Sequence, residues 1–144
     1  MIKTILVGVD GSASSRKAAT VAAELAASTG ATLHVLTAVD PRSQGGQSEP
    51  GRPLGDARLL TPGEAAEAIA AEIAGSLDSV VPHIESSPIQ GKPADALVAE
   101  ATRLGADLIV VGNRRVQGLG RLLGSVAADV AQHAPCDVYI VKTV

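Results

Sequence analysis

Residues Lys3–Val9 read KTILVGV, a short and nearly continuous run of apolar side chains. A run of this length without alternating polar positions is typical of a strand that is buried on both faces of a sheet. A third strand is expected within 81–89, where Pro82 weakens the pattern. Similar apolar runs are TLHVLTAV at 32–39, DLIVV at 107–111 and DVYIV at 137–141.

The segments between these strands carry helix signals. The stretch Ala13–Thr29 is rich in alanine, and Gly30 follows as a stop. Thr61-Pro62-Gly63-Glu64 matches a capping box, which opens a helix that runs to about Asp78. Two further helices are expected, one opening at Lys92-Pro93 and ending before Gly105, the other covering about 125–133. Strict alternation of strands and helices predicts a doubly wound α/β domain, with a parallel sheet that helices cover on both faces.

The chain has 144 residues, which suits a single domain over residues 1–144. Residues 42–60 are rich in Gly, Pro, Gln and Ser, and we interpret them as a flexible loop within that domain. There is no Phe or Trp, so the core must be built from Val, Ile, Leu and Ala.

The charge and the cysteine content narrow the range of partners. A formal net charge of -3 gives no general attraction to nucleic acid or to an anionic membrane. No apolar run is long enough for a membrane span, and the N-terminal run is too short for a signal peptide. A single cysteine, Cys136, excludes an internal disulfide and fits a reducing cytoplasm.

In doubly wound sheets, ligands bind beyond the carboxyl ends of the strands, where this sequence places several polar groups. Asp10 follows the first strand and suits a ribose hydroxyl or a divalent cation. Gly124 and Ser125 begin a helix, whose free N–H groups favour an anion. Arginines at 114, 115 and 121 can add charge-assisted hydrogen bonds. Together these features indicate a nucleotide site, although ordinary helix capping and solvated surface arginines account for each feature taken alone.

Motifs of other functional classes are absent from the sequence. There is no Walker A motif, no complete dinucleotide fingerprint and no Gly-x-Ser-x-Gly elbow. His34, His83 and His133 lack metal-ligand spacing, and Cys136 has no activating neighbour in sequence. We therefore expect no catalytic residue.

The segments ILVGVDGSASS (5–15), Gly91-Lys92-Pro93 and VVGNRRVQGLGRLLGSVAADVAQHAPCDVYIVK (110–142) resemble the universal stress protein family. The resemblance covers the whole chain. It implies a five-stranded parallel sheet in the order 3-2-1-4-5 and a homodimer formed through the last strand, Asp137–Val141. Some members of the family bind ATP and some do not, and the resemblance implies an adenine nucleotide, with ATP as the first expectation, at the carboxyl edge of the sheet.

Residues are carried over from the family by matching position. The resemblance places Mg²⁺, where it is bound, near Asp10. The phosphates would lie against Gly124, Ser125 and Val126. The adenine and ribose would contact Gly8, Val9, Asp10, Val39, Val111 and Gly112.

The chain departs from the ATP-binding pattern of the family, which reads Gly, two residues, Gly, nine residues, Gly-Ser. Arg115 stands where that pattern has its second Gly, and only eight residues separate it from Gly124. Arginine resists the positive φ and the close approach that glycine allows, but its charge can replace backbone contacts to a phosphate.

The leading hypothesis is a cytoplasmic, homodimeric stress-response sensor that binds an adenine nucleotide and is not an enzyme. The first alternative is a nucleotide-free interaction module of the same family. The second alternative, a weak ATPase, requires a water-activating group that the sequence does not provide.

Overall fold

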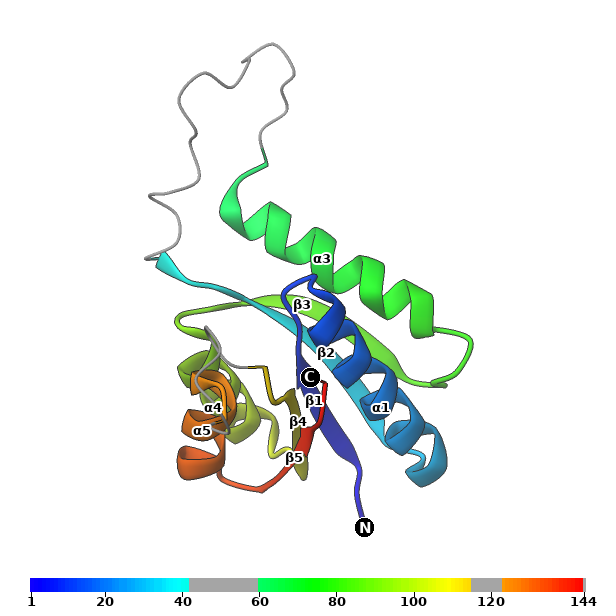
Figure 1. Ribbon diagram of the computed structural model, residues 1–144. Helices are drawn as coiled ribbons and strands as arrows, with labels where there is room; N and C mark the ends of the chain where they lie inside the picture. Colours follow the sequence, from blue (N-terminus) through cyan, green and yellow to red (C-terminus); the bar gives the residue numbers. More distant parts are fainter. Residues whose placement is uncertain (42–59, 115–122, 144) are drawn as a thin grey trace.

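The computed structural model describes residues 1–41, 60–114 and 123–143. Within these ranges, strands and helices alternate along the chain (Figure 1). The strands are β1 (Thr4–Gly8), β2 (Thr32–Val39), β3 (Ile84–Gln90), β4 (Leu108–Gly112) and β5 (Asp137–Val141). The helices are α1 (Ala13–Thr29), α3 (Pro62–Leu77), α4 (Pro93–Leu104) and α5 (Ser125–His133).

The strands form one parallel sheet in the order β3-β2-β1-β4-β5. Helices α1 and α3 cover one face of the sheet, and α4 and α5 cover the other (Figure 1). The predicted doubly wound α/β fold is therefore confirmed, as is the strand order implied by the family resemblance. Strand order reverses between β1 and β4, so their carboxyl ends diverge into helices on opposite faces and leave a crevice between them.

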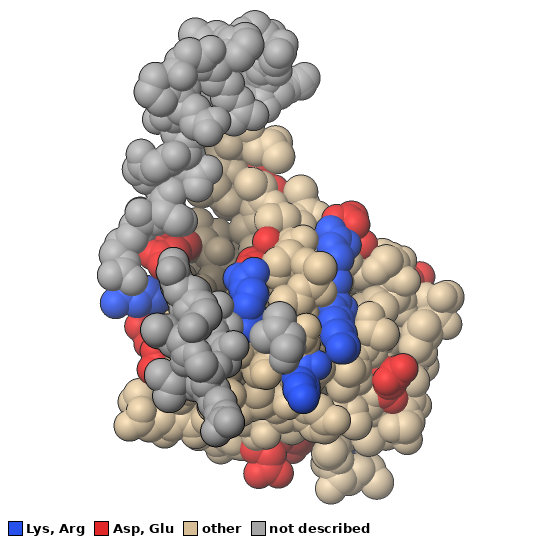
Figure 2. Space-filling view, viewed as in Figure 1, with Lys and Arg blue, Asp and Glu red and all other residues tan. Residues whose placement is uncertain are grey.

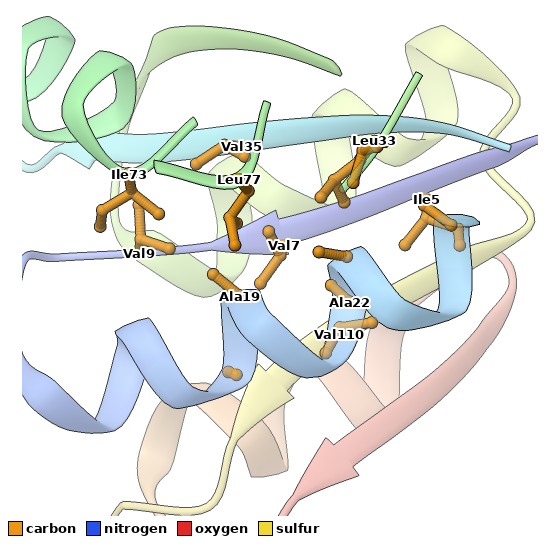
Figure 3. Packing of buried hydrophobic residues seen from close by; sticks show 14 of the residues in the cluster. Ile5, Val7, Val9, Ala19, Ala22, Leu33, Val35, Ile73, Leu77 and Val110 are labelled. Atoms are coloured by element: carbon orange, nitrogen blue, oxygen red, sulfur yellow. The ribbon is translucent and has the colours of Figure 1, made fainter. Parts of the chain in front are cut away.

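The central strand β1 is buried on both faces because it lies between two layers of helices. Ile5, Leu6 and Val7 are each 0% exposed. Ile5 and Val7 pack with α1 and α3 (Figure 3), whereas Leu6 packs with α4 and α5. Strand side chains alternate between the two faces, so one short apolar run supplies both halves of the core.

Every buried residue of helix α1 is an alanine, and Val21 and Leu25 on the same helix are partly buried against the core. A small side chain lets the helix backbone lie close to the sheet, which compensates for the lack of aromatic side chains in the core. The helix ends as predicted at Gly30, whose φ of 76° is in the left-handed region and whose N–H donates to Ala26 O at 2.9 Å. The buried residues of α1 are Ala18, Ala19, Ala22, Ala23 and Ala26.

The third strand, Ile84–Gln90, lies within the predicted stretch 81–89 except for its last residue, and residues 81–83 precede it. The N–H of Val81 donates back to Leu77 O at 3.1 Å, so this segment completes the turn at the end of α3. Val81 is buried as an anchor of that turn (1% exposed) rather than as a strand residue. The apolar signal at Val81 was genuine, but the burial that it indicated belongs to the helix end.

The other predicted boundaries lie within one residue of the observed ones, and those of α1, β2, α5 and β5 coincide. The capping box at Thr61 is present with both of its hydrogen bonds. Of the predicted loop 42–60, residues 42–59 lie outside the described residues, and Leu60 is exposed. None of the described helices combines the length and apolar character needed to cross a membrane.

Charged side chains on the described surface are interspersed rather than segregated. On the face shown in Figure 2, Lys and Arg form separate groups among uncharged and acidic residues. One pair joins two helices: Arg16 on α1 contacts both carboxylate oxygens of Glu72 on α3, at 2.9 and 2.8 Å. Both side chains are exposed, so this contact orients the helices more than it stabilises them.

Thr37 on β2 provides a test of the core. Its side chain is buried (5% exposed), and among the described residues its hydroxyl has no hydrogen-bond partner. Thr37→Val keeps the shape and removes the unsatisfied group, so we expect the free energy of unfolding to rise by about 1 kcal/mol in urea denaturation. The matched control is Val35→Thr, which introduces a hydroxyl at a fully buried position on the same face of β2 and should lower stability by about 1–3 kcal/mol. A loss of stability in Thr37→Val would show that the hydroxyl has a partner.

Candidate functional site

A cavity of about 160 Å³ lies at the carboxyl ends of β1 and β4. Strand ends, helix starts and the polar turn after β1 meet around it, as the topology of a doubly wound sheet requires. Its polar and glycine lining residues are Gly8, Asp10, Ser12, Ser14, Ser15, Gly112 and Arg114, and its apolar lining residues are Val9, Leu36, Ala38, Ile89, Pro93, Leu97, Val111 and Val126.

Two glycines form the floor of this cavity, and both lie at positions where a larger side chain meets a neighbour. A Cβ built on Gly8 would lie 2.8 Å from Cδ1 of Leu97, which itself lines the cavity. A Cβ on Gly112 would lie 3.2 Å from Cγ2 of Thr143. The bare backbone at the two strand ends therefore allows both close packing and the close approach of a ligand.

The turn after β1 is held by side chains of its own segment. Gly11, with φ of 87°, allows the chain to reverse into α1. The N–H of Ser12 donates to Oδ1 of Asp10 at 2.9 Å, and Ser12 caps α1 by accepting from the N–H of Ser15 at 3.1 Å. Ser12, and not Asp10, therefore caps α1. The Asp10 carboxylate lies at the edge of the cavity.

Asp10 faces Arg114 across the end of the sheet. Nη2 of Arg114 lies 2.9 Å from Oδ2 of Asp10, and both side chains are about half exposed. Burial is the largest single influence on this carboxyl and would raise its pKa. Hydrogen bonds from Ser12 and Ser15, together with the charge of Arg114, outweigh it and bring the pKa below its ordinary 3.8. Asp10 is therefore ionised at neutral pH.

The segment after β5 is joined to the cavity wall. Asn113 Oδ1 accepts from the N–H of Thr143 at 2.8 Å and from its hydroxyl at 3.2 Å. The Thr143 hydroxyl also contacts the hydroxyl of Ser14, which lines the cavity. Hydrogen bonds between α1, β4 and the chain after β5 therefore fix the position of Ser14.

The structure brings most of the sequence-predicted site residues together. Six of them line the cavity: Gly8, Val9, Asp10, Val111, Gly112 and Val126. Gly124 is buried and is the N-cap of α5 in an extended conformation, and Ser125 is the exposed first residue of that helix. No side-chain capping bond is formed at the start of α5. Arg115 and the shortened segment after it lie outside the described residues.

Val39 is placed differently from the other predicted residues. It is buried (5% exposed) and does not line the cavity. Ala38 and Leu36 line the cavity instead, and alternation along β2 turns Val39 to the opposite face of the sheet. Its carbonyl accepts from the N–H of Gly91 at 3.0 Å. A contact between Val39 and a ligand stays a prediction.

Sequence reasoning missed the hydroxyls of Ser14 and Ser15. The signal that could have identified them is the helical start Ser12-Ala13-Ser14-Ser15, because the first turn of α1 points toward the strand ends. It also missed the apolar wall formed by Leu36, Ile89 and Leu97, which requires knowing which strand faces which helix.

The described residues fit a resident divalent cation poorly. No group of three His, Cys, Asp or Glu side chains with metal-binding proximity occurs among them. Asp10 would be the acidic ligand, but its two oxygens already accept from Ser12 and Arg114. Mg²⁺ requires near-octahedral oxygen coordination, so it would have to displace the guanidinium.

A second hollow, of about 290 Å³, lies between α4 and α5. It is larger but lies away from the strand ends, and its lining contains no strand residue. Its lining residues are Ala94, Asp95, Val98, Ala99, Asp129 and His133. The first cavity is the better candidate because glycine backbone, a carboxylate and helix starts converge there.

Comparison with known proteins agrees with this architecture. Residues 1–142 match the universal stress protein family. A universal stress protein of Thermus aquaticus is 38% identical over 143 residues, covering 99% of this chain and 100% of the relative. One of Mycobacterium tuberculosis is 38% identical over 144 residues, covering 98% of this chain and 97% of the relative.

Solved structures give the same result. A universal stress protein crystallised in complex with cAMP is 40% identical, covers 99% of each chain and superimposes with a TM-score of 0.76. The universal stress protein UspA of Lactobacillus plantarum is 27% identical, covers 98% of each chain and has a TM-score of 0.74. The family match over nearly the whole chain, the relatives and the shared fold lead to one conclusion: this chain belongs to the universal stress protein family.

Proposed function

We propose that this protein binds an adenine nucleotide in the cavity at the carboxyl ends of β1 and β4, and that it acts in the cytoplasm as a stress-response regulator rather than as an enzyme. The observation that carries the proposal is the convergence of two bare strand ends, Gly8 and Gly112, with the Asp10 carboxylate and the start of α5 around one cavity. The relative solved with cAMP supports an adenine nucleotide as the ligand class.

The cavity divides into regions that suit the parts of a nucleotide. Leu36, Ile89 and Leu97 form an apolar wall, which suits a flat heterocyclic base. Asp10 is an ionised acceptor for ribose hydroxyls. The N–H groups at the start of α5, near Gly124 and Ser125, suit a phosphate. ATP is the nucleotide that the family pattern implies, and cAMP or AMP needs fewer phosphate contacts.

The described part of the chain places no histidine or cysteine in the lining of the cavity. Its three histidines lie at 34, 83 and 133, none of which lines the cavity. Desolvation, followed by the charges of Asp137 and Asp107, raises the pKa of the Cys136 thiol, which disfavours the nucleophilic thiolate. These features support the proposed binding role.

The Gly8→Ala variant tests the site. The new Cβ overlaps with Leu97, which must move into the space assigned to the base, so we expect affinity for cAMP, AMP and ATP to fall by roughly 10-fold or more. Isothermal titration calorimetry measures this change. The matched control is Gly75→Ala in α3, where a Cβ meets nothing within 4 Å and binding should be unchanged.

Wild-type protein that binds none of the three nucleotides at millimolar concentration would contradict the proposal. It would favour the alternative of a nucleotide-free interaction module, which the departure from the family pattern at Arg115 motivates. Equal affinity in Gly8→Ala and wild type would place the ligand outside this cavity.

We further propose a homodimer through β5. This strand is an edge of the sheet, and an unprotected edge readily pairs with another copy. Tyr139 on β5 is 44% exposed, so a large and partly apolar side chain lies on this open edge.

Tyr139→Glu tests the dimer. In a two-fold interface centred on β5 the same residue approaches its own copy, so paired carboxylates repel each other and monomer is the expected product. Sedimentation velocity measures the oligomeric state. Val80→Glu is the control, because Val80 is equally exposed (46%) but lies in the turn before β3. A dimer that persists in Tyr139→Glu would move the interface elsewhere.

A further inference from the structure

The contact between Asp10 and Arg114 joins the two strand ends that form the cavity. Asp10 follows β1 and Arg114 follows β4, and both side chains line the cavity. Oδ2 of Asp10 accepts from Nη2 of Arg114 at 2.9 Å, and Oδ1 accepts from the N–H of Ser12 at 2.9 Å. Each carboxylate oxygen therefore has a donor before any ligand arrives.

This arrangement opposes a divalent cation. A metal bound to Asp10 would replace the guanidinium at Oδ2, and a guanidinium that stayed nearby would repel the metal. Among the described residues, no group of three or more acidic, histidine or cysteine side chains could hold a metal, and no such residue other than Asp10 lines the cavity. The one carboxylate that the described residues contribute to the cavity holds an arginine in place.

Arg114 is equipped to contact a phosphate itself. Its guanidinium carries five N–H donors in a fixed fork, and the contact with Asp10 uses Nη2. It lines the same cavity as Val126, the second residue of α5, so the charged side chain and the helix start face one space. Asp10 balances much of the arginine charge, so the pair suits an anion of low charge better than a triphosphate.

We propose that Arg114 takes the place of a divalent cation in this cavity: the nucleotide is held without metal, and a nucleotide with one phosphate is preferred over ATP. This inference rests on the proposed nucleotide binding and names the charge class of the ligand. Arg114 then acts as a specificity-determining residue that Asp10 positions.

The first test is calorimetric titration of wild type and Arg114→Gln with cAMP, AMP and ATP, each in EDTA and in Mg²⁺. In wild type, affinity for cAMP and AMP should exceed that for ATP and should be the same in both buffers. In Arg114→Gln, affinity for cAMP in EDTA should fall roughly 10- to 100-fold, because charge-assisted hydrogen bonds are lost. Mg²⁺ should now strengthen ATP binding, because Oδ2 of Asp10 is released.

Two variants control this test. Arg103→Gln removes an exposed arginine whose partner is Glu100 on the same helix, away from the cavity, and should leave all affinities unchanged. Arg114→Lys keeps the charge but loses the fork, so binding should be weaker than wild type and still independent of metal. Because Arg114 is half exposed, its substitution should leave the fold intact, and thermal melting checks that each variant is folded.

The outcomes separate this inference from the proposed function. Wild-type binding that is lost in EDTA would overturn the metal-free site and leave nucleotide binding intact. Unchanged affinity in Arg114→Gln would also overturn the role of the arginine. Absence of binding in every buffer would defeat the proposed function itself.

An independent readout is the titration of Asp10 followed by NMR of its carboxyl carbon. The pKa of Asp10 in wild type lies below 3.8, and the charge of Arg114 contributes to that lowering. Arg114→Gln should raise the pKa, whereas Arg103→Gln should not. Since a lowered pKa means that the ion pair is complete above pH 3.8 and is lost as pH falls through the folded value, nucleotide affinity should be constant across neutral pH. A pKa that is the same in wild type and Arg114→Gln would contradict the contact.

Discussion

The whole molecule depends on one strand whose three central residues have no contact with water. Ile5, Leu6 and Val7 in β1 are fully buried because β2 and β4 flank the strand and helices cover both of its faces. A strand so enclosed cannot present polar side chains along its length, so polar chemistry is confined to its end. That constraint explains why Asp10 follows the strand directly, and why the cavity lies at the carboxyl edge.

In this core, which contains no Phe or Trp, small residues allow the elements to pack closely. The alanines of α1 allow close packing on the sheet, and Gly8 accepts Leu97 where any side chain would collide with it. In such a core, neighbouring side chains have little room to shift when one residue is replaced, because core atoms are already in contact on every side. The same close packing holds the side chains of the cavity wall in fixed positions.

The strands and helices could be predicted from the sequence because the signals that mark them are local. A buried strand such as β1 is a run of apolar residues, and a helix end such as Gly30 is marked by one residue with a special φ. Even at β3, where the strand occupies only part of the predicted stretch, the reason is local, since Val81 is buried for a helix end rather than for a strand. Strand order, by contrast, came only with the family resemblance.

Only part of the candidate site could be predicted from the sequence. Asp10 and Gly112 were proposed because each stands at the carboxyl end of a strand, whereas Val126 was carried over from the family by position. The Arg114 to Asp10 contact joins residues separated by 104 positions, and no local pattern shows which arginine reaches the carboxylate. The hydrophobic wall was missed for the same reason: it is formed by side chains from three separate elements.

The position of the single tyrosine has a spectroscopic consequence. With no Trp or Phe in the chain, Tyr139 on β5 is the sole aromatic side chain and hence the sole intrinsic fluorophore. Emission from this protein therefore reports on one edge strand and on nothing in the interior. Its polarisation and quenching would follow what happens at that edge, undisturbed by the rest of the fold, without any label being attached.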